Sequence, residues 1–410
     1  MRHIYTSIDI GSDNIKVVVC ELYQNKLNLL AASSFKSKGI KKGLITDVEL
    51  ASITIKQAIS EVENILNIKI KKVITSVPSY LAEYTIIKGS TTTLNGSITH
   101  DDVMKSLEVA MKSKVISGKE MVTILPIDFK IDNKEGITEP VGLIGNTLDC
   151  RAVLVSVPKK NIYSVVGVLE SIGIEVIDIS LNNIGDLYAF KNKNFDEKIS
   201  AIINIGSETT SVSLYNRNVV IKSSILNMGG KNIDSDISYM LKIDEGTANR
   251  LKTKFAVATK KFASTHDLYE VKNADGILKV NQLEVSSIVE SRLEEILNLA
   301  KNELNNLTSK QIDYIIITGG VVNTAGFEHL VSDIFPNQAH VGNIKILGVR
   351  NCKYSACIGN IVYFINKLKL KGKDYTMIND DEASTMVTTT SNRSSSDSVL
   401  GKIFGYFFNE

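Results

Sequence analysis

The sequence predicts an α/β protein built from two copies of one unit, with a smaller α+β insertion in the first copy. The first observation is a pair of matching stretches, 4–20 and 201–215, each with an apolar strand, a polar turn that begins with Gly-Ser, and a second strand. The second is their separation of roughly 195 residues, which indicates an internal duplication. The third is a change in the predicted secondary-structure pattern within 84–157, where short strands and one helix replace the longer alternation of strands and helices.

The composition is that of an ordinary globular protein, long enough for two or more domains. Of the 410 residues, 43% are hydrophobic and 22% are charged, and the formal net charge is +2. This balance favours no nucleic-acid partner, and we expect none. The four cysteines show no metal-type pairing, which is typical of buried thiols in a reducing compartment. The sequence starts in a strand without an apolar signal core, and no run approaches the ~18 apolar residues of a spanning helix, so we expect a cytoplasmic protein.

The first matching stretch carries the groups that a phosphate site needs. Its turn begins with Gly11 and Ser12, which offer unhindered backbone N–H groups and a hydroxyl. Asp9, two positions earlier, is a carboxylate suited to hold a water of a metal ion, and Lys16 supplies a cation. Taken alone, the stretch is explained better by an ordinary hairpin with a glycine turn.

The second stretch changes that interpretation. Asn204 falls where Asp9 fell, and Gly206 with Ser207 falls where the first Gly-Ser pair fell. Two such hairpins that face each other across a cleft would clamp a polyphosphate from both sides.

The other elements follow from apolar periodicity, caps and breakers. In the first half we expect strands at 27–35, 72–78 and 175–179 and helices at 46–66, 159–172 and 181–190. Within the insertion we expect short strands at 85–88, 91–94, 122–131 and 150–157 and a helix at 98–113. The insertion shows no catalytic constellation, which indicates an interaction module.

The second half repeats the plan and adds two glycine pairs. Gly229 and Gly230 precede a helix, where free N–H groups and the helix dipole suit an anion, although a plain loop would also explain them. Gly319 and Gly320 end an apolar strand that begins near residue 313, and a flat ring could lie there against the backbone. We also expect a strand at 218–226 and helices at 244–255, 280–307 and 354–367.

The end of the chain predicts a tether and an amphipathic helix. Residues 371–396 are rich in Ser, Thr, Asn and Asp and are expected to be a disordered linker. In 397–410 the apolar residues gather on one face of a helix, with Lys402 as the cation of the segment. A helix behind a tether has no core of its own, so this face would bind a membrane, a protein partner or the body of the chain itself. The apolar face consists of Val399, Leu400, Ile403, Phe404, Phe407 and Phe408.

Together these motifs resemble the ATPase fold shared by actin, Hsp70 and the sugar kinases. The insertion after the first Val-Pro and the amphipathic tail narrow the resemblance to the FtsA family of bacterial cell-division proteins, over nearly all of the chain. The resemblance implies a duplicated actin/Hsp70-like ATPase fold with an inserted α+β subdomain and a C-terminal amphipathic helix. It divides the chain into a first half (1–83 and 158–198) with the insertion (84–157), a second half (199–227 and 307–370) with a smaller subdomain (228–306), the linker (371–396) and the tail (397–410).

The resemblance also implies a site for ATP and Mg²⁺. The family's phosphate loops fall on Asp9, Gly11, Ser12, Asp13 and Lys16 and on Gly206, Ser207, Glu208 and Thr209, and its adenosine pocket falls on Gly229, Gly230, Lys252, Gly319, Gly320 and Val321. Mg²⁺ would be held largely through water by Asp9, with Asn204 at the matching position of the second loop.

Several positions depart from the family pattern. The second loop usually reads Asp-Ile-Gly-Gly-Gly-Thr, so Asn204 lacks a charge and Glu208 adds repulsion near the γ-phosphate. Asn183 lies where related ATPases place a water-positioning group, and it is a poor base. The Ala-Glu usual in the adenosine-side helix is Ala248-Asn249. These departures predict a nucleotide-binding switch with slow or absent hydrolysis, and they leave open whether the chain is an enzyme.

FtsA resemblance implies a peripheral protein on the cytoplasmic face of the membrane at the division site. Such a protein tethers filaments of the tubulin-like FtsZ through 228–306, contacts other division proteins through 84–157, binds lipids through 397–410, and self-associates under the control of ATP. Two alternatives share the fold: an actin-like pilus or plasmid-segregation scaffold, and a small-molecule kinase. The kinase would need an acidic base in the cleft and has no use for the tail.

Overall fold

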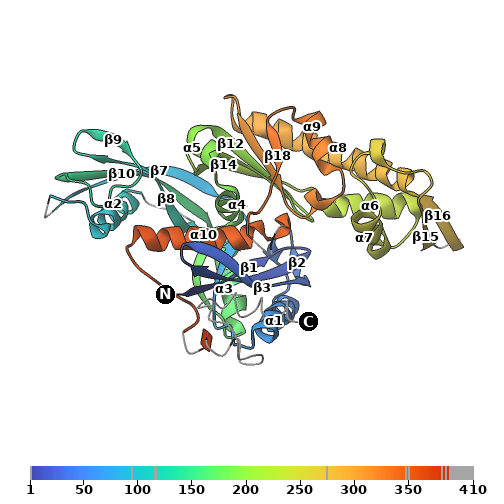
Figure 1. Cartoon of the computed structure of the whole chain (residues 1–410), viewed down its shortest axis with the longest axis horizontal. Coiled ribbons are helices and arrows are strands. Elements are labelled where there is room, and N and C mark those ends of the chain that lie inside the picture. The colour runs from blue at the N-terminus through green and yellow to red at the C-terminus, as the bar shows by residue number, and fades with distance from the viewer. Residues whose placement is uncertain are drawn as a thin grey trace.

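The computed structural model describes residues 2–93, 96–114, 118–273, 276–346, 349, 351–379, 382–383 and 386. Two five-stranded sheets form the body, the insertion projects at one end, and a helical subdomain projects at the opposite end (Figure 1). The predicted tail at 397–410 lies outside the described residues.

The first sheet has the strand order β11-β6-β1-β2-β3. Strands β1, β2 and β3 are antiparallel neighbours, whereas β6 runs parallel to β1 and β11 runs parallel to β6. Nearly every residue of β1 is buried, because helices or the other half cover both faces of the sheet. The bounds are β1 His3–Ile10, β2 Asn14–Tyr23, β3 Lys26–Lys36, β6 Lys72–Val77 and β11 Glu175–Leu181, with a small ribbon of β4 Ile40–Lys41 and β5 Leu44–Ile45 beside them.

The second sheet repeats this topology in the order β18-β17-β12-β13-β14. Strands β12, β13 and β14 are antiparallel neighbours, and β17 and β18 are added in parallel beyond β12. The shared order and directions confirm the duplicated fold that the two hairpins predicted. The bounds are β12 Ile199–Ile205, β13 Thr210–Asn216, β14 Val219–Leu226, β17 Tyr314–Thr318 and β18 Ala339–Val341.

Helices cover the two sheets and join them. The side chain of Asp47 caps the first of these helices by accepting the N–H of Leu50, as the sequence indicated. Helix α10 packs on β1, β2 and β6 of the first sheet and against α4, so these two helices lie between the halves (Figure 1). The bounds are α1 Val48–Leu66, α3 Lys159–Ser171, α4 Asn182–Phe190, α5 Lys193–Glu197, α9 Phe327–Ile334 and α10 Ser355–Leu370.

The contact between α4 and α10 is made of backbone. A Cβ built on Gly359 would lie 1.6 Å from the carbonyl oxygen of Gly185, and one built on Gly185 would lie 2.8 Å from the carbonyl oxygen of Ala356. No side chain fits between the two helices at this point, so the spacing of the halves depends on these glycines.

The insertion is a four-stranded antiparallel sheet, in the order β7-β10-β8-β9, with one helix on it and a separate hydrophobic core. The predicted pair of short strands at 85–88 and 91–94 is a single strand, β7, which pairs along β10. A capping box between Thr99 and Asp102 begins α2. The bounds are β7 Glu83–Thr92, α2 His100–Lys112, β8 Lys119–Ile131, β9 Lys134–Ile137 and β10 Thr147–Pro158.

The smaller subdomain of the second half is mostly helical. A capping box between Asn281 and Glu284 begins its long helix, which packs along β13 and β14 of the second sheet. The bounds are α6 Gly230–Leu241, α7 Glu245–Lys254, β15 Leu268–Asn273, β16 Gly276–Asn281 and α8 Gln282–Leu307.

The linker prediction is wrong at its start. Residues 371–379 lie against the first half, where Met377 donates its N–H to the carbonyl of Ile4 at 2.9 Å and Ile4 donates to the hydroxyl of Thr376 at 3.0 Å. Met377 and Ile378 are buried, since this short apolar pair covers the start of β1. Among the described residues, no helix is both long and apolar enough to cross a membrane.

Candidate functional site

A cavity of about 470 Å³ opens between the halves, where three strands end. Strands β1 and β12 finish one residue after Asp9 and Asn204, and β17 finishes immediately before Gly319. Ligands of α/β proteins bind at this edge of a sheet, and the volume falls within the ~300–1,000 Å³ of small-molecule sites. Of the predicted site residues, the cavity is lined by Asp9, Gly11, Ser12, Asp13, Lys16, Asn204, Gly206, Ser207, Glu208, Thr209, Gly230, Lys252, Gly319, Gly320 and Val321.

The first hairpin holds a buried ion pair at the floor of the cavity. Asp9 and Lys16 are direct neighbours across β1 and β2, and the Lys16 Nζ lies 2.7 Å from Asp9 Oδ2. Burial lowers the pKa of Lys16, but Asp9, with smaller contributions from Cys357 and Asp13, raises it by more, so the pKa of Lys16 lies above its ordinary value. A carboxylate and an ammonium group therefore face the cavity together.

The acid beside the second hairpin, Asp186, lies on α4 and not on the hairpin itself. Asn204 donates its Nδ2 to Asp186 Oδ2 at 2.7 Å, and the hydroxyl of Ser355 donates to Asp186 Oδ1 at 2.6 Å. Burial raises the pKa of Asp186 to about 6, although both hydrogen bonds act in the opposite direction. The sequence analysis missed Asp186, because a single acid in a predicted helix has no pattern that marks it.

The proposed water-positioning role of Asn183 is not supported by the geometry. Asn183 is buried outside the cavity, and its Nδ2 donates to the hydroxyls of Tyr84 and Ser213. Its neighbour Asn182 lines the cavity instead. The buried Asn182 Oδ1 has no hydrogen-bond partner among the described residues, which is what a site for water or ligand needs.

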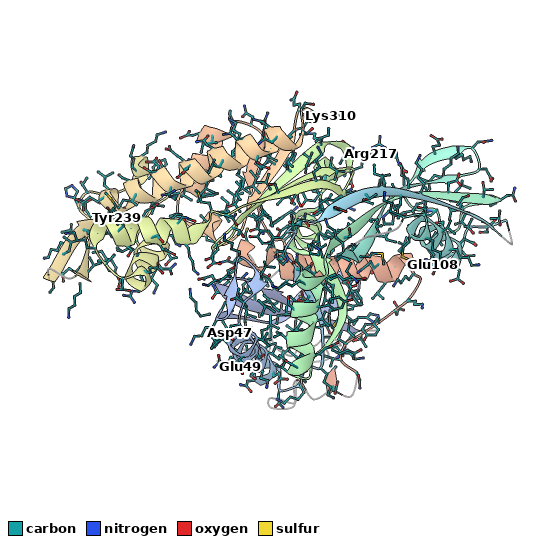
Figure 2. All side chains as sticks on the ribbon, turned by 180° about the vertical axis from the view of Figure 1, so that it is seen from behind. Asp47, Glu49, Glu108, Arg217, Tyr239 and Lys310 are labelled. Carbon is teal, nitrogen blue, oxygen red and sulfur yellow. The ribbon has the colours of Figure 1, made fainter. Side chains whose placement is uncertain are left out.

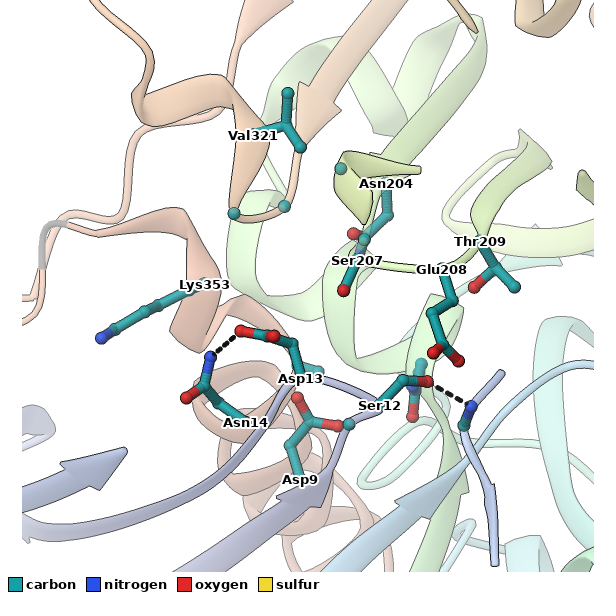
Figure 3. A pocket seen from close by; sticks show the side chains of 18 of the residues that line it. Asp9, Ser12, Asp13, Asn14, Asn204, Ser207, Glu208, Thr209, Val321 and Lys353 are labelled. Carbon is teal, nitrogen blue, oxygen red and sulfur yellow. Dashed lines mark hydrogen bonds between the residues drawn. The ribbon is translucent and has the colours of Figure 1, made fainter. Parts of the chain in front are cut away.

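The two hairpins also meet across the mouth of the cavity. Glu208, on the second hairpin, accepts the backbone N–H of Lys42 at 2.6 Å, and Ser12, on the first hairpin, accepts the N–H of Gly43 at 2.7 Å. Figure 3 shows the side chains of Glu208 and Ser12 pointing toward each other from opposite sides of the cavity. Lys42 and Gly43 form the turn between β4 and β5, so this turn contacts both hairpins.

Glycines allow the second hairpin to pack closely. A Cβ on Gly229 would lie 2.6 Å from the carbonyl oxygen of Gly206, so Gly229 serves backbone packing and does not itself line the cavity. Gly319 has a φ of +106° and would place a Cβ 2.2 Å from the carbonyl oxygen of Ile205, whereas Gly320 faces open space. A flat ligand could therefore approach the backbone at Gly320.

A polar cluster forms the far wall. Lys252 lies 2.7 Å from Asp234 and donates to the carbonyl of Gly230 at 2.9 Å, and Asn249 donates to Asp234 at 3.0 Å.

On the other side, Lys353 lines the cavity and makes no salt bridge with the residues that the structure describes. Burial lowers the pKa of Lys353, with a further contribution from Lys16. Sequence analysis missed Lys353, which lies in a loop before α10.

These residues fit a nucleotide with a hydrated cation. Lys16 and Lys353 supply two cations to the lining, and Gly320 leaves open space beside Val321 in which a base could lie. Within the described ranges, no three His, Cys, Asp or Glu side chains converge to hold a metal directly. A Mg²⁺ ion here would keep several waters and use phosphate oxygens as ligands, which is its usual behaviour in nucleotide sites.

Two family models match this chain. The model described as "Cell division protein FtsA" matches residues 201–359, and the model described as "SHS2 domain inserted in FTSA" matches residues 83–156. The second match coincides with the insertion that carries its own core. Together the two FtsA models cover more than half of the chain.

Relatives and solved structures agree with these models. The cell division protein FtsA of Bacillus subtilis (strain 168) is 27% identical over 377 residues, which are 91% of this chain and 86% of that protein. The FtsA of Streptococcus pneumoniae serotype 2 is 27% identical over 358 residues, 86% of this chain and 78% of that protein.

Among solved structures, Spiroplasma citri MreB5 bound to ADP superimposes with a TM-score of 0.55 at 14% identity, over 90% of this chain and 98% of that one. The PilM-PilN type IV pilus biogenesis complex gives a TM-score of 0.58 at 12% identity, over 88% and 98%. At such identities these two structures are evidence for the actin-like fold alone.

Proposed function

This chain belongs to the FtsA family of cell-division proteins, and on that premise we propose that it is an ATP-dependent switch that links FtsZ filaments to the cytoplasmic membrane. The observation that supports the switch is the convergence of two hairpins, one from each half, on a single cavity. A ligand with several phosphates would contact both hairpins and so couple the positions of the halves. The ADP bound to Spiroplasma citri MreB5, which shares the fold, supports a nucleotide as that ligand.

The residues of the cavity have separable roles in this proposal. Lys16 pairs with phosphate charge, Asp9 orients the water shell of Mg²⁺, and Gly230, Gly320 and Val321 receive the adenosine. Bound Mg²⁺ supplies charge neutralisation at the phosphates. Asp186, the acid beside the second hairpin, is buried behind Asn204 and has no free access to the cavity, so it is poorly placed to act as a general base. We therefore expect hydrolysis to be slow or absent.

Partner binding is assigned to the two ends of the molecule. On the smaller subdomain, Tyr239 is 83% exposed and Met240 is 64% exposed on α6, and we assign the FtsZ tail to the 228–306 region that carries them (Figure 2). On the insertion, Ile86 and Ile144 are exposed, and we assign other division proteins to 84–157. Self-association would then respond to nucleotide through the spacing of the halves.

Membrane attachment is assigned to 397–410, which places the protein on the cytoplasmic face of the membrane at the division site. The test is co-sedimentation of the full chain with liposomes in the presence of ATP and Mg²⁺, against a chain truncated after Ser396 and a Phe404→Glu/Phe407→Glu variant. Sedimentation of the intact chain alone would support the anchor, and recruitment of FtsZ to those liposomes would support the tether. Equal sedimentation of all forms, or of none, would favour a pilus-type scaffold that uses the tail on a protein.

Nucleotide binding is tested separately on the full chain. A fluorescent ATP analogue should bind in the presence of Mg²⁺, and Lys16→Met should weaken that binding at least ~100-fold, because the phosphates lose a buried cation. Binding that survives Lys16→Met unchanged would contradict the assignment of the cavity.

A further inference from the structure

Glu208 occupies a position that the nucleotide-switch proposal does not explain. It lies at the centre of the second phosphate hairpin, 16% exposed, with its carboxylate at the mouth of the cavity. A carboxylate at this position would repel the phosphates of a bound nucleotide. A role for Glu208 in surface packing alone does not explain why a negative charge lies there.

Each oxygen of the Glu208 carboxylate already accepts a donor. Its Oε2 accepts the backbone N–H of Lys42, and its Oε1 accepts the Nζ of Lys231. Lys42 belongs to the first half, and Lys231 belongs to the first turn of α6 in the second half. One anionic side chain therefore joins the halves on the open side of the cavity.

The turn that Glu208 holds is also held by the first hairpin. The N–H of Gly43 donates to the Ser12 hydroxyl, so adjacent N–H groups of the β4–β5 turn are shared between the two hairpins. The backbone of Lys42 has a φ of +51°, which shows that this turn is set in a defined left-handed conformation. The turn is held in place by two oxygen acceptors, one of which is Glu208.

The charge of Glu208 is stable at neutral pH. Burial raises the pKa of Glu208, but Lys231, the N–H of Lys42 and the hydroxyl of Ser12 together lower it by more, so the net pKa lies below its ordinary value. The carboxylate accepts one ammonium donor and one backbone donor. A terminal phosphate oxygen is likewise an anionic acceptor and would bind the same two donors.

We propose that Glu208 is a built-in anion that substitutes for the terminal phosphate of the nucleotide, so that the chain closes over a nucleoside diphosphate and is opened by a triphosphate. A γ-phosphate would compete with Glu208 for Lys231 and for the N–H of Lys42, and it would be repelled by the carboxylate. Displacement of Glu208 would free the β4–β5 turn. The inference rests on the proposed nucleotide site, and it states that this site prefers the diphosphate to the triphosphate.

The test compares the affinities of the full chain for ADP and for a non-hydrolysable ATP analogue, with Mg²⁺, by calorimetry. Glu208→Gln keeps the size of the side chain and removes its charge, and Glu208→Gly removes the contact altogether. Each variant should shift the affinity ratio toward the triphosphate by about tenfold or more, because the repulsion is lost. The control is Glu270→Gln, which neutralises an exposed Glu–Lys pair in the distant β15–β16 hairpin and should leave the ratio unchanged.

A second measurement follows the turn itself. Hydrogen–deuterium exchange of residues 40–45 should be slow with ADP, faster with the triphosphate analogue, and fast in Glu208→Gly with either. If both nucleotides bind but the ratio stays within about twofold in both Glu208 variants, the inference is overturned and the nucleotide site stands. If the unaltered folded chain binds neither nucleotide, the proposed function and this inference both fail.

Discussion

The two hairpins that meet in the cavity have the same topology, but they stabilise their polar groups in different ways. The first hairpin is self-contained, because Asp9 and Lys16 are cross-strand neighbours on β1 and β2. The second hairpin depends on its surroundings: Asn204 is bonded to Asp186 on α4, and its backbone rests against Gly319 after β17. Duplication thus preserved the backbone framework, while the buried acid is on the hairpin in one copy and on a neighbouring helix in the other.

The difference has a physical consequence for robustness. An acid paired within one hairpin stays paired as long as that hairpin is formed. An acid on α4 is correctly placed only when α4, β12 and α10 are packed together, since Ser355 of α10 is its other partner. The second site should therefore be more sensitive to changes elsewhere in the chain.

The largest effect is expected from Gly319→Ala, which would break the support of the second hairpin. The added methyl group would meet the carbonyl of Ile205 at 2.2 Å in a backbone conformation with φ +106°. We expect a loss of about 4 kcal/mol in the free energy of unfolding, measured by urea denaturation. Gly320→Ala is the matched control, since its methyl group would face open space, and it should unfold within about 0.5 kcal/mol of the unaltered chain. Equal effects of the two substitutions would contradict the packing.

The next effect tests the self-contained hairpin. Lys16→Met leaves Asp9 buried without its partner, and we expect the free energy of unfolding to fall by about 3 kcal/mol without nucleotide. The control is Lys36→Met, whose exposed side chain pairs with Asp13 on the same hairpin. That change should cost about 0.5 kcal/mol or less. A small cost for Lys16→Met would mean that Asp9 is stabilised by other groups.

A third prediction uses pH to sharpen the comparison. The pKa of Asp186 is raised to about 6 in the folded chain from an ordinary value of 3.8, so the folded state binds this proton more tightly than the unfolded state does. The stabilising contribution is therefore present below the ordinary pKa and is lost as pH rises through 6.

Denaturation at several pH values, with a chelator present and nucleotide absent, would measure the contribution of Asp186 to the free energy of unfolding. Between pH 4.5 and 7.5, the stability of Asp186→Asn relative to the unaltered chain should rise by roughly 2 kcal/mol. A pH-independent difference would show that Asp186 is not buried as an acid in solution.

The smallest effect is expected on nucleotide affinity, when the acid Asp186 and the amide Asn204 are changed. Asp186→Asn alone should weaken binding of the Mg²⁺-loaded triphosphate about tenfold, because the amide of Asn204 exchanges a charged acceptor for a neutral one and is oriented less strongly. The double variant Asp186→Asn/Asn204→Asp keeps one amide donor and one carboxylate acceptor, and it should recover most of the affinity. Failure of the double variant to recover, with its melting temperature intact, would show that the acid must lie on α4.

Sequence reasoning was most successful where the signal is local. Strand, turn and strand occur within about 17 residues of each hairpin, so Gly11, Ser12, Gly206 and Ser207 were located in the cavity by pattern alone. Asn183 does not line the cavity, whereas its neighbour Asn182 does, because neighbours on a helix point about 100° apart.

What could not be predicted depends on packing between distant segments. Asp186 matters because α4 docks against β12, and the contact of Glu208 with Lys42 spans 166 positions in the sequence. The start of the linker was misjudged for a similar reason. Met377 and Ile378 are too few to form an apolar pattern, yet β1 offers a surface that buries them.

The attachment of residues 376–378 to β1 also determines how the molecule would bear mechanical load. A pull applied beyond residue 386 acts first on the buried Met386 and Ala383 and on the ion pair between Glu382 and Lys71. It then reaches the hydrogen bond between Met377 and Ile4. The tension then enters β1, in which Asp9 lies about 17 Å from Ile4 by the rise of a β-strand. Force from the C-terminal side and a nucleotide in the cavity, as proposed above, would therefore act near the two ends of the same strand.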